Sequence, residues 1–364
     1  MRLENWAQIR LGLQSYLPGP GWVCVKVDSV TVTFKTLQIG LLLALPRLIV
    51  QSVGQLRSVN FPTNITAMTV KPWQGILTAT ATPFRSDLSI DFDKYAEHVK
   101  WLASFGHLGV IPNGSLGEYQ VLTREERSEM VRCAIAAAPK GFQVVPGVAA
   151  YGASEARSWA EQAAQSGASA VMLLPPTAYR ASDDEVLAHY KEVGKVGIPI
   201  IAYNNPFDTK VDLTPDLVGR IADEVPQVVA IKEFSGDVRR VWQIHASAPR
   251  IEVLVGADDV LLELATGGVS GWIAGFTNAL PRESKIVYDL AISGDFVKAR
   301  PLYAALHDLF HWDSKKEFIQ AIKATMEFEG RYGGPTRLPR LPLPKADKEK
   351  IHKQYLQFKE TFKA

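Results

Sequence analysis

The sequence predicts an α/β fold of the (β/α)8 TIM-barrel class with a C-terminal helical extension. From Gly75 onward, short apolar runs alternate with segments of helical periodicity, and eight such units fit into about 220 residues, close to what a barrel needs. No Gly-x-Gly-x-x-Gly follows the first run and no Walker motif occurs, so the phosphate-binding devices of open doubly wound sheets are missing. Further helical segments follow the eighth unit. We therefore favour the barrel over an open sheet.

Each apolar run is short enough for one barrel strand. In chain order the runs are GILTATATPF (75–84), LGVIPNG (108–114), FQVVPGVA (142–149), AVMLLPP (170–176), PIIAYNNP (199–206), VVAIKEFS (228–235), EVLVGADD (252–259) and GWIAGF (271–276). Amphipathic stretches lie between them, and several open on a Ser, Thr or Asp that can cap a helix. They include residues 93–105, 123–138, 154–167 and 214–225.

The predicted barrel covers residues 68–295, and residues 296–364 form the extension. Helical segments at 296–310 and 315–330 are followed by the proline-broken run RLPRLPLP (337–344) and a charged helix that ends at Ala364. We expect this part to pack on the barrel rather than to form an independent domain.

Residues 1–67 form a separate N-terminal extension. Its apolar run, 37–50, is interrupted by Gly40, Pro46 and Arg47 and is shorter than the roughly 20 residues that a membrane-spanning helix needs. It also lies too far from Met1 for a standard signal peptide. Either this segment is a transit segment or the gene model is extended and the protein begins at Met68. We favour the second interpretation, which predicts a cytoplasmic protein, whereas a transit segment would indicate the mitochondrion.

Composition and charge exclude several classes of protein. The 364 residues are 47% hydrophobic and 21% charged, which is ordinary for a globular protein and not for a disordered or membrane protein. The net charge is +2, of which residues 1–67 carry +4 and the remainder −2, so no basic surface indicates nucleic-acid binding. Two cysteines, Cys24 and Cys133, are too few for a disulfide scaffold and fit a reducing compartment.

Candidate site residues stand at the carboxyl ends of the predicted strands, where barrels of this class place their active sites. These residues are Asn113, Gly114, Ser115, Gly117, Glu118, Tyr203, Asn204, Lys232, Asp258 and Asp259. Lys232 is the most informative, because a buried strand normally excludes a lysine. It would point into the barrel if its alternate neighbours, Ala230 and Phe234, do so.

A desolvated lysine has a lowered pKa, and its neutral amine can attack a carbonyl to form a Schiff base. Tyr203 could relay the protons of that reaction, and Ser115 with the backbone amides of NGSLGE could bind a substrate carboxylate. The structural alternatives are an ion pair of Lys232 with Glu118 or Glu233, a buried tyrosine with a satisfied hydroxyl, and an ordinary glycine turn. The presence of all three features at strand ends favours the catalytic interpretation.

Metal chemistry is not predicted. HDLFH (307–311) resembles the His-Glu-x-x-His zinc motif, but its acid is Asp, it follows the barrel, and no third ligand is evident. The pair Asp258 and Asp259 is more typical of a cap on the next helix than of a metal site.

Residues 73–343 resemble the dihydrodipicolinate synthase and N-acetylneuraminate lyase (DapA-like) family. The resemblance rests on LTATATPF, GSLGE followed by LTREER, YNNP, IKEFSGD, GADD and the closing RLPRLPL. It implies a class I aldolase-type lyase, usually a homotetramer, which uses no metal and no organic cofactor. It also implies roles for single residues: Lys232 as the Schiff-base lysine, Tyr203 as the proton relay, Ser115 and Leu116 as carboxylate-binding residues, and Gly256 and Ile273 as pocket neighbours.

Two departures from the synthase bear on the substrate. In the synthase, the resemblance implies, an arginine five positions after the YNxP tyrosine binds the carboxylate of the second substrate, where this chain has Asp208. The resemblance also implies a second tyrosine, donated across a subunit interface from the loop after the fourth strand, where this chain has Ala178, one position from Tyr179. The runs KEFSGDVRRV, GWIAGFTNALPRES and KEFIQAIK are similar to the subgroup that deaminates 1-pyrroline-4-hydroxy-2-carboxylate in hydroxyproline breakdown.

We therefore predict a Schiff-base lyase or deaminating hydrolase for a small 2-oxo acid or cyclic imino acid, with that imino acid as its substrate. The alternatives are 4-hydroxy-tetrahydrodipicolinate synthase and a 2-keto-3-deoxy sugar acid aldolase. A different class, a catalytically silent barrel that binds a 2-oxo acid, also stays open.

Overall fold

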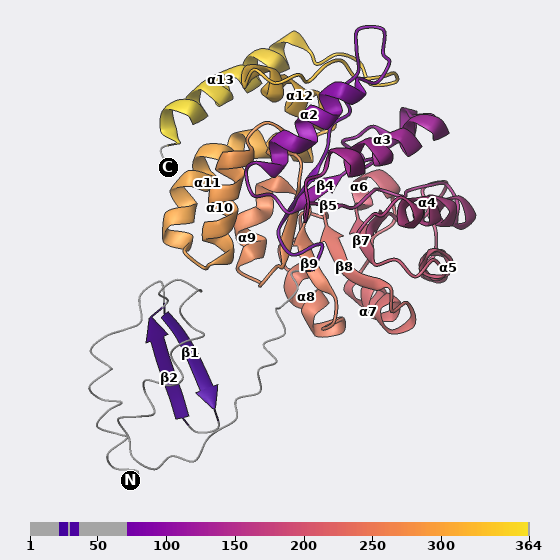
Figure 1. Cartoon of the computed structure of the whole chain (residues 1–364), viewed down its shortest axis with the longest axis vertical. Helices are drawn as coiled ribbons and strands as arrows, with labels where there is room; N and C mark the ends of the chain where they lie inside the picture. The colour runs from indigo at the N-terminus through magenta and orange to yellow at the C-terminus, as the bar shows by residue number, and fades with distance from the viewer. Residues whose placement is uncertain (1–21, 28–29, 36–70, 363–364) are drawn as a thin grey trace. The chain divides into compact units, whose positions relative to one another are not determined.

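The computed structural model describes residues 22–27, 30–35 and 71–362, which belong to two compact units. The first unit contains an antiparallel strand pair, β1 (Trp22–Val27) and β2 (Val30–Lys35), which the sequence analysis did not predict (Figure 1). The predictions for the apolar run at 37–50 and for a start at Met68 lie outside the described residues.

The second unit contains a parallel eight-stranded sheet in the order β5-β4-β3-β10-β9-β8-β7-β6. Its strands are β3 (Ile76–Ala79), β4 (Gly109–Ile111), β5 (Gln143–Val144), β6 (Val171–Leu173), β7 (Ile200–Asn204), β8 (Val228–Glu233), β9 (Glu252–Val255) and β10 (Gly271–Ala274). A parallel bridge between Gly147 and Met172 joins the end next to β5 to β6, and the Val148 amide donates to the Met172 carbonyl at 2.9 Å. The sheet thus closes on itself, and the predicted TIM barrel is confirmed.

Helices follow the strands around the barrel (Figure 1). They are α2 (Phe92–Ala103), α3 (Arg124–Ala137), α4 (Ala153–Gln165), α5 (Asp183–Gly194), α6 (Pro206–Thr209), α7 (Pro215–Glu224), α8 (Arg240–Ser247), α9 (Leu261–Ala265) and α10 (Pro281–Ile292), with short 3-10 helices η3 (Tyr119–Val121), η4 (Asp258–Val260) and η5 (Phe276–Asn278). Local chemistry fixes several starts. Thr123 and Glu126 form a capping box at α3, and Ser182 and Glu185 form one at α5.

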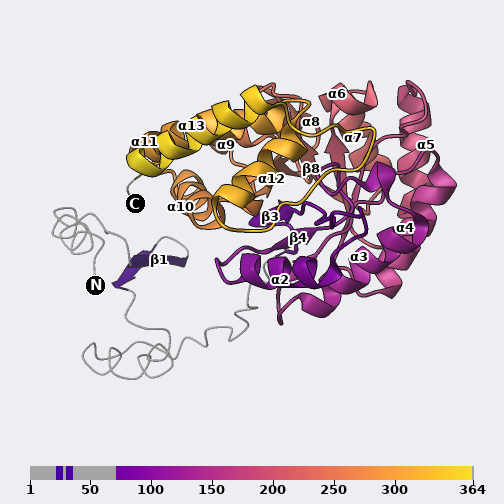
Figure 2. The ribbon, with the colours of Figure 1, turned by 90° about the horizontal axis from the view of Figure 1, so that it is seen from above.

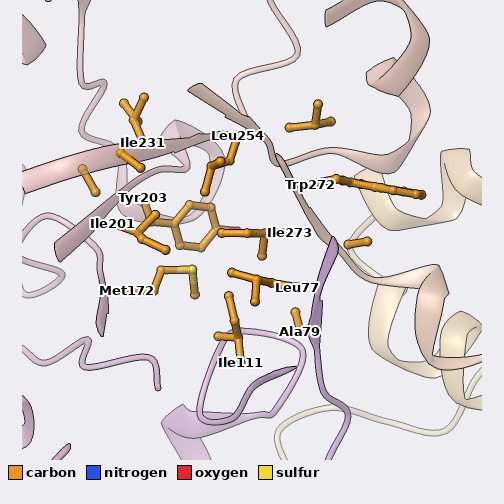
Figure 3. Packing of buried hydrophobic residues seen from close by; sticks show 14 of the residues in the cluster. Leu77, Ala79, Ile111, Met172, Ile201, Tyr203, Ile231, Leu254, Trp272 and Ile273 are labelled. Carbon is orange, nitrogen blue, oxygen red and sulfur yellow. The ribbon is translucent and has the colours of Figure 1, made fainter. Parts of the chain in front are cut away.

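The barrel interior is filled by apolar side chains from its strands. Figure 3 shows the ring of Tyr203 surrounded by Leu77, Ile111, Met172 and Ile273, which come from four other strands. All of these side chains are buried, so the barrel is a packed core rather than a pore. A ligand would therefore bind at an end of the barrel rather than inside it.

The C-terminal extension consists of α11 (Phe296–Phe310), η6 (His311–Ser314), α12 (Phe318–Phe328) and α13 (Lys345–Thr361). Figure 2 shows α11, α12 and α13 together on one side of the barrel. The buried side chains Ile351, Tyr355 and Phe358 of α13 belong to the same hydrophobic cluster as the barrel strands. The predicted helical extension is therefore present, and it shares the barrel's core. None of the helices between residues 71 and 362 is long and apolar enough to cross a membrane.

Candidate active site

A cavity of about 340 Å³ lies at the carboxyl ends of the barrel strands. Barrel residues in its wall are Ala79, Gly114, Ser115, Leu116, Met172, Tyr203, Asn205, Phe207, Asp208, Lys232, Phe234 and Gly275. The extension completes the wall with Asp313, Ser314, Lys315, Lys316, Phe318 and Arg340. The cavity is therefore built by both parts of this unit.

Lys232 lies in the wall of this cavity, near the carboxyl end of β8. The residue is only 6% exposed, and its Nζ lies 4.3 Å from the ring centroid of Tyr203 and 5.5 Å from that of Phe234. Among the described residues no carboxylate forms an ion pair with it. Burial lowers the pKa of Lys232 to about 8, although the charges of Asp313, Asp258 and Asp208 act in the opposite direction. A useful fraction of the amine is therefore neutral near physiological pH.

The two acids that were considered as ion-pair partners of Lys232 make other contacts. Glu118 forms a buried ion pair with Lys323 of α12, with 2.9 Å between Oε1 and Nζ. Glu233 accepts hydrogen bonds from the side-chain amide of Asn204 and from the backbone amide of Ser235. The alternative in which Lys232 serves an ion pair with either acid is therefore wrong.

Tyr203 stands directly beside Lys232, because the two residues are paired in the register of β7 and β8. Its hydroxyl accepts a hydrogen bond from Nδ2 of Asn205 at 3.2 Å. Burial raises the pKa of Tyr203 well above its ordinary value of 10.0, and the nearby charge of Asp208 adds to that effect. The phenol therefore stays protonated, so it can donate a proton to a leaving oxygen and recover it.

The loop after β4 brings Ser115 and Leu116 into the cavity wall. Its conformation is unusual, since Asn113 and Glu118 adopt φ values of 58° and 55°. Two contacts from the extension hold Glu118 in place: the Lys323 ion pair and the backbone amide of Arg337, which donates to Oε2 at 3.1 Å. The extension therefore fixes the loop that was predicted to bind a carboxylate.

Four predicted binding residues do not line the cavity. The Gly117 carbonyl accepts a hydrogen bond from the Thr82 hydroxyl at 2.7 Å, away from Lys232. Asn204, next to Tyr203 on β7, points to the other face of the sheet and donates to Asp212 and Glu233. Gly256 packs against β8, since a Cβ there would lie 2.4 Å from the Glu233 carbonyl oxygen, and Ile273 is a core residue beside Tyr203 (Figure 3).

The two acids after β9 do not cap the next helix, contrary to the prediction. The carboxylate of Asp258 accepts hydrogen bonds from Nε1 of Trp272 at 3.0 Å and from the Phe276 amide at 2.7 Å, so it fixes the turn after β10. Asp259 binds His311 at 2.7 Å and Ser314 at 2.8 Å, and so ties η6 to the barrel. Within the described residues no group of three or more His, Cys, Asp or Glu is arranged to hold a metal.

Sequence reasoning missed the wall that the extension supplies. Asp313 and Arg340 follow no predicted strand, and nothing in their local sequence marks them as site residues. Asn205 could have been found, since it is the second asparagine of the YNNP motif. Asp208, noted as a departure from the synthase, does line the cavity, whereas Ala178 and Tyr179 do not.

Comparisons with known proteins identify the family. Residues 72–357 match the Dihydrodipicolinate synthetase family, which is most of the chain. The chain belongs to this family. It is accordingly a member of a family of class I aldolase-type lyases.

The alignments with relatives from this family include most of each relative's length. A 4-hydroxy-tetrahydrodipicolinate synthase of Methanothrix thermoacetophila is 30% identical over 282 residues, which are 77% of this chain and 95% of the relative. Another from Anaplasma marginale is 34% identical over 275 residues, 74% of this chain and 89% of the relative. Among solved structures, the synthase of Acinetobacter baumannii, complexed with pyruvate, superposes with a TM-score of 0.75 at 28% identity, covering 79% of this chain and 99% of that one.

Proposed function

We propose that this protein is a lysine Schiff-base lyase that acts on a small 2-oxo acid. The observation that carries this proposal is the Nζ of Lys232, which is buried in a cavity wall beside Tyr203 without an ion-pair partner in the described part of the chain. Burial of an unpaired lysine is costly, and the neutral amine that results is the form needed for attack on a carbonyl.

In the proposed reaction the amine of Lys232 attacks the C2 carbonyl of the 2-oxo acid and forms a carbinolamine. Tyr203 gives its proton to the C2 oxygen, which leaves as water while the Schiff base forms. The substrate carboxylate lies at the loop with Ser115 and Leu116. The relatives' activity and the pyruvate complex of the Acinetobacter synthase support pyruvate as the first 2-oxo acid to test.

Reductive trapping tests this function. Borohydride added with pyruvate should fix a covalent adduct on the peptide that contains Lys232, detected by mass spectrometry. Lys232→Met should abolish the adduct, whereas Lys315→Met, which removes another cavity-lining lysine, should retain it. If a panel of 2-oxo acids gives no adduct in the wild-type protein, the alternative of a catalytically silent binding barrel replaces this proposal.

Two substrate assignments follow from different observations. The names of the relatives support 4-hydroxy-tetrahydrodipicolinate synthase, in which the pyruvate-derived enamine attacks a second, carboxylate-bearing substrate. Lys315 and Arg340 line the cavity and could bind that second carboxylate. Deamination of 1-pyrroline-4-hydroxy-2-carboxylate is the second candidate, because an acid, Asp208, lines the cavity where the synthase has its carboxylate-binding arginine.

A turnover screen separates the two. The synthase assignment predicts consumption of aspartate semialdehyde together with pyruvate, and the deaminase assignment predicts ammonia release from the hydroxyproline-derived imine without pyruvate. A sugar-acid aldolase would instead release pyruvate from a 2-keto-3-deoxy acid. The homotetramer that the family implies is likewise a proposal, which sedimentation of the purified protein would test.

A further inference from the structure

Asp313 takes no part in the chemistry proposed above, although its carboxyl lies in the wall of the same cavity. It belongs to η6 of the extension and is 7% exposed. Its Oδ2 accepts the backbone N–H of Asp258 at 3.3 Å, and a Cβ added to Gly275 would lie 2.5 Å from its Oδ1. The carboxyl group is thus held between the ends of β9 and β10. Strand β9 is the neighbour of β8, which carries Lys232, and β10 is the next strand of the sheet.

Asp313 differs from the two other acids near Lys232 in its hydrogen bonding and burial. The Asp258 carboxylate is occupied by three N–H groups, those of Trp272, Gly275 and Phe276. Asp208 is exposed and hydrogen-bonded to Asn205. In the described part of the chain Asp313 accepts only one long hydrogen bond, from the Asp258 amide, so most of its lone pairs are free to meet a ligand.

The surroundings of Asp313 make its carboxylate a stronger base than an exposed one. Burial raises the pKa of Asp313 well above its ordinary value, the charge of Asp258 raises it further, and that of Asp259 adds a little. Lys232, on β8, opposes this shift. Tyr203, on β7, cannot serve as this base, because burial raises its pKa and its phenol stays protonated. Asp313 is therefore a buried base in the cavity wall that the proposed mechanism does not use.

We propose that Asp313 is a further catalytic residue, the base that removes a proton from C3 of the 2-oxo acid bound to Lys232. This inference rests on the proposed Schiff base. In the step, the C3–H bond breaks and its proton passes to the Asp313 carboxylate. The electron pair forms the C2=C3 bond, and the C2=N pair moves to the nitrogen, so the protonated imine becomes a neutral enamine. The reverse transfer returns the proton, and no other reactant is needed.

Hydrogen exchange of pyruvate tests this step apart from any second substrate. In deuterated water the wild-type protein should replace the methyl protons of pyruvate with deuterium, which proton NMR follows. Asp313→Asn can still accept the Asp258 N–H, so it should keep the borohydride-trapped adduct while exchange falls about 100-fold or more. The matched control is Asp308→Asn, which removes an exposed carboxylate of α11 that does not line the cavity and should leave exchange within about threefold of wild type.

A pH profile gives a readout that a merely structural role would not move. The rate of hydrogen exchange, divided by the amount of trapped adduct, should rise with pH as Asp313 ionises. This rise with pH should disappear in Asp313→Asn. Undiminished exchange in Asp313→Asn would overturn the inference. It is equally overturned if Asp313→Asn and Asp313→Ser lose the adduct together with exchange, since the residue would then be structural. Absence of any adduct in the wild-type protein would overturn the proposed function itself.

Discussion

Lys232 is set apart from an ordinary lysine by its pKa of about 8, which arises first from burial. Because only the neutral amine attacks a carbonyl, the rate of adduct formation with pyruvate should rise with pH and level off above about pH 8. Asp313→Asn removes a charge that raises the pKa of Lys232, so the rise in the rate of adduct formation should occur at lower pH. Initial rates of trapped adduct at several pH values check both statements. A rate that rises only near pH 10.5, the ordinary pKa of a lysine, would contradict them.

Tyr203 contributes both a ring and a hydroxyl, and Tyr203→Phe removes only the second. The ring stays beside Nζ of Lys232, so the fold and the cavity wall should persist. Loss of the proton relay should slow adduct formation with pyruvate by about 100-fold or more, the range typical of general acid–base catalysis. Stopped-flow trapping measures this rate. Tyr190→Phe is the control: this buried tyrosine donates to the Leu173 carbonyl outside the cavity and should leave the rate unchanged.

Single residues show how far strand-end reasoning reaches. Lys232 was predicted to face the interior because side chains alternate along a strand. Tyr203 was predicted because it stands at the carboxyl end of its strand. The same alternation turns Asn204 to the outer face, although it adjoins Tyr203. Asp313 could not be predicted, since its place in the cavity wall depends on how a segment after α11 packs on the ends of β9 and β10. That packing leaves no local sequence pattern.

At the scale of elements, the buried pair of Glu118 and Lys323 joins the loop after β4 to α12, with both side chains at most 3% exposed. Lys323→Met leaves the Glu118 charge buried and without its ammonium partner, so the free energy of unfolding should fall by about 3–5 kcal/mol. Urea denaturation measures this loss.

A double variant distinguishes the charge effect from lost packing. Glu118→Gln combined with Lys323→Met removes both charges, so its free energy of unfolding should lie above that of Lys323→Met alone. Equal or greater loss in the double variant would show that the pair acts mainly through packing. Because Glu118 positions the loop that contains Ser115, the affinity for pyruvate should likewise be higher in the double variant than in Lys323→Met.

The strands themselves are shorter than their apolar runs. The run at 142–149 gives only β5, Gln143–Val144, although the amides of Val145 and Gly147 still donate to the carbonyls of Val110 and Pro112. The first run, at 75–84, yields β3 at Ile76–Ala79, and the rest enters the loop that faces Asn278 and Gly117. Hydrophobic pattern therefore predicted the number and order of the strands, whereas their ends depend on hydrogen bonds made across the barrel.

At the scale of the barrel unit, strands and extension share one hydrophobic cluster, so the two parts should unfold together. Phe358 of α13 is 2% exposed within that cluster, and Phe358→Ala should lower the free energy of unfolding by about 3–5 kcal/mol. Leu356, on the same helix but 49% exposed, provides the control, and Leu356→Ala should change the free energy of unfolding by about 0.5 kcal/mol or less.

Calorimetry should show a single endotherm of this unit moved to lower temperature in Phe358→Ala. A separate low-temperature endotherm in that variant would show that the extension undocks by itself. Because Asp313 and Arg340 belong to the extension, such undocking would also open the cavity wall beside Lys232.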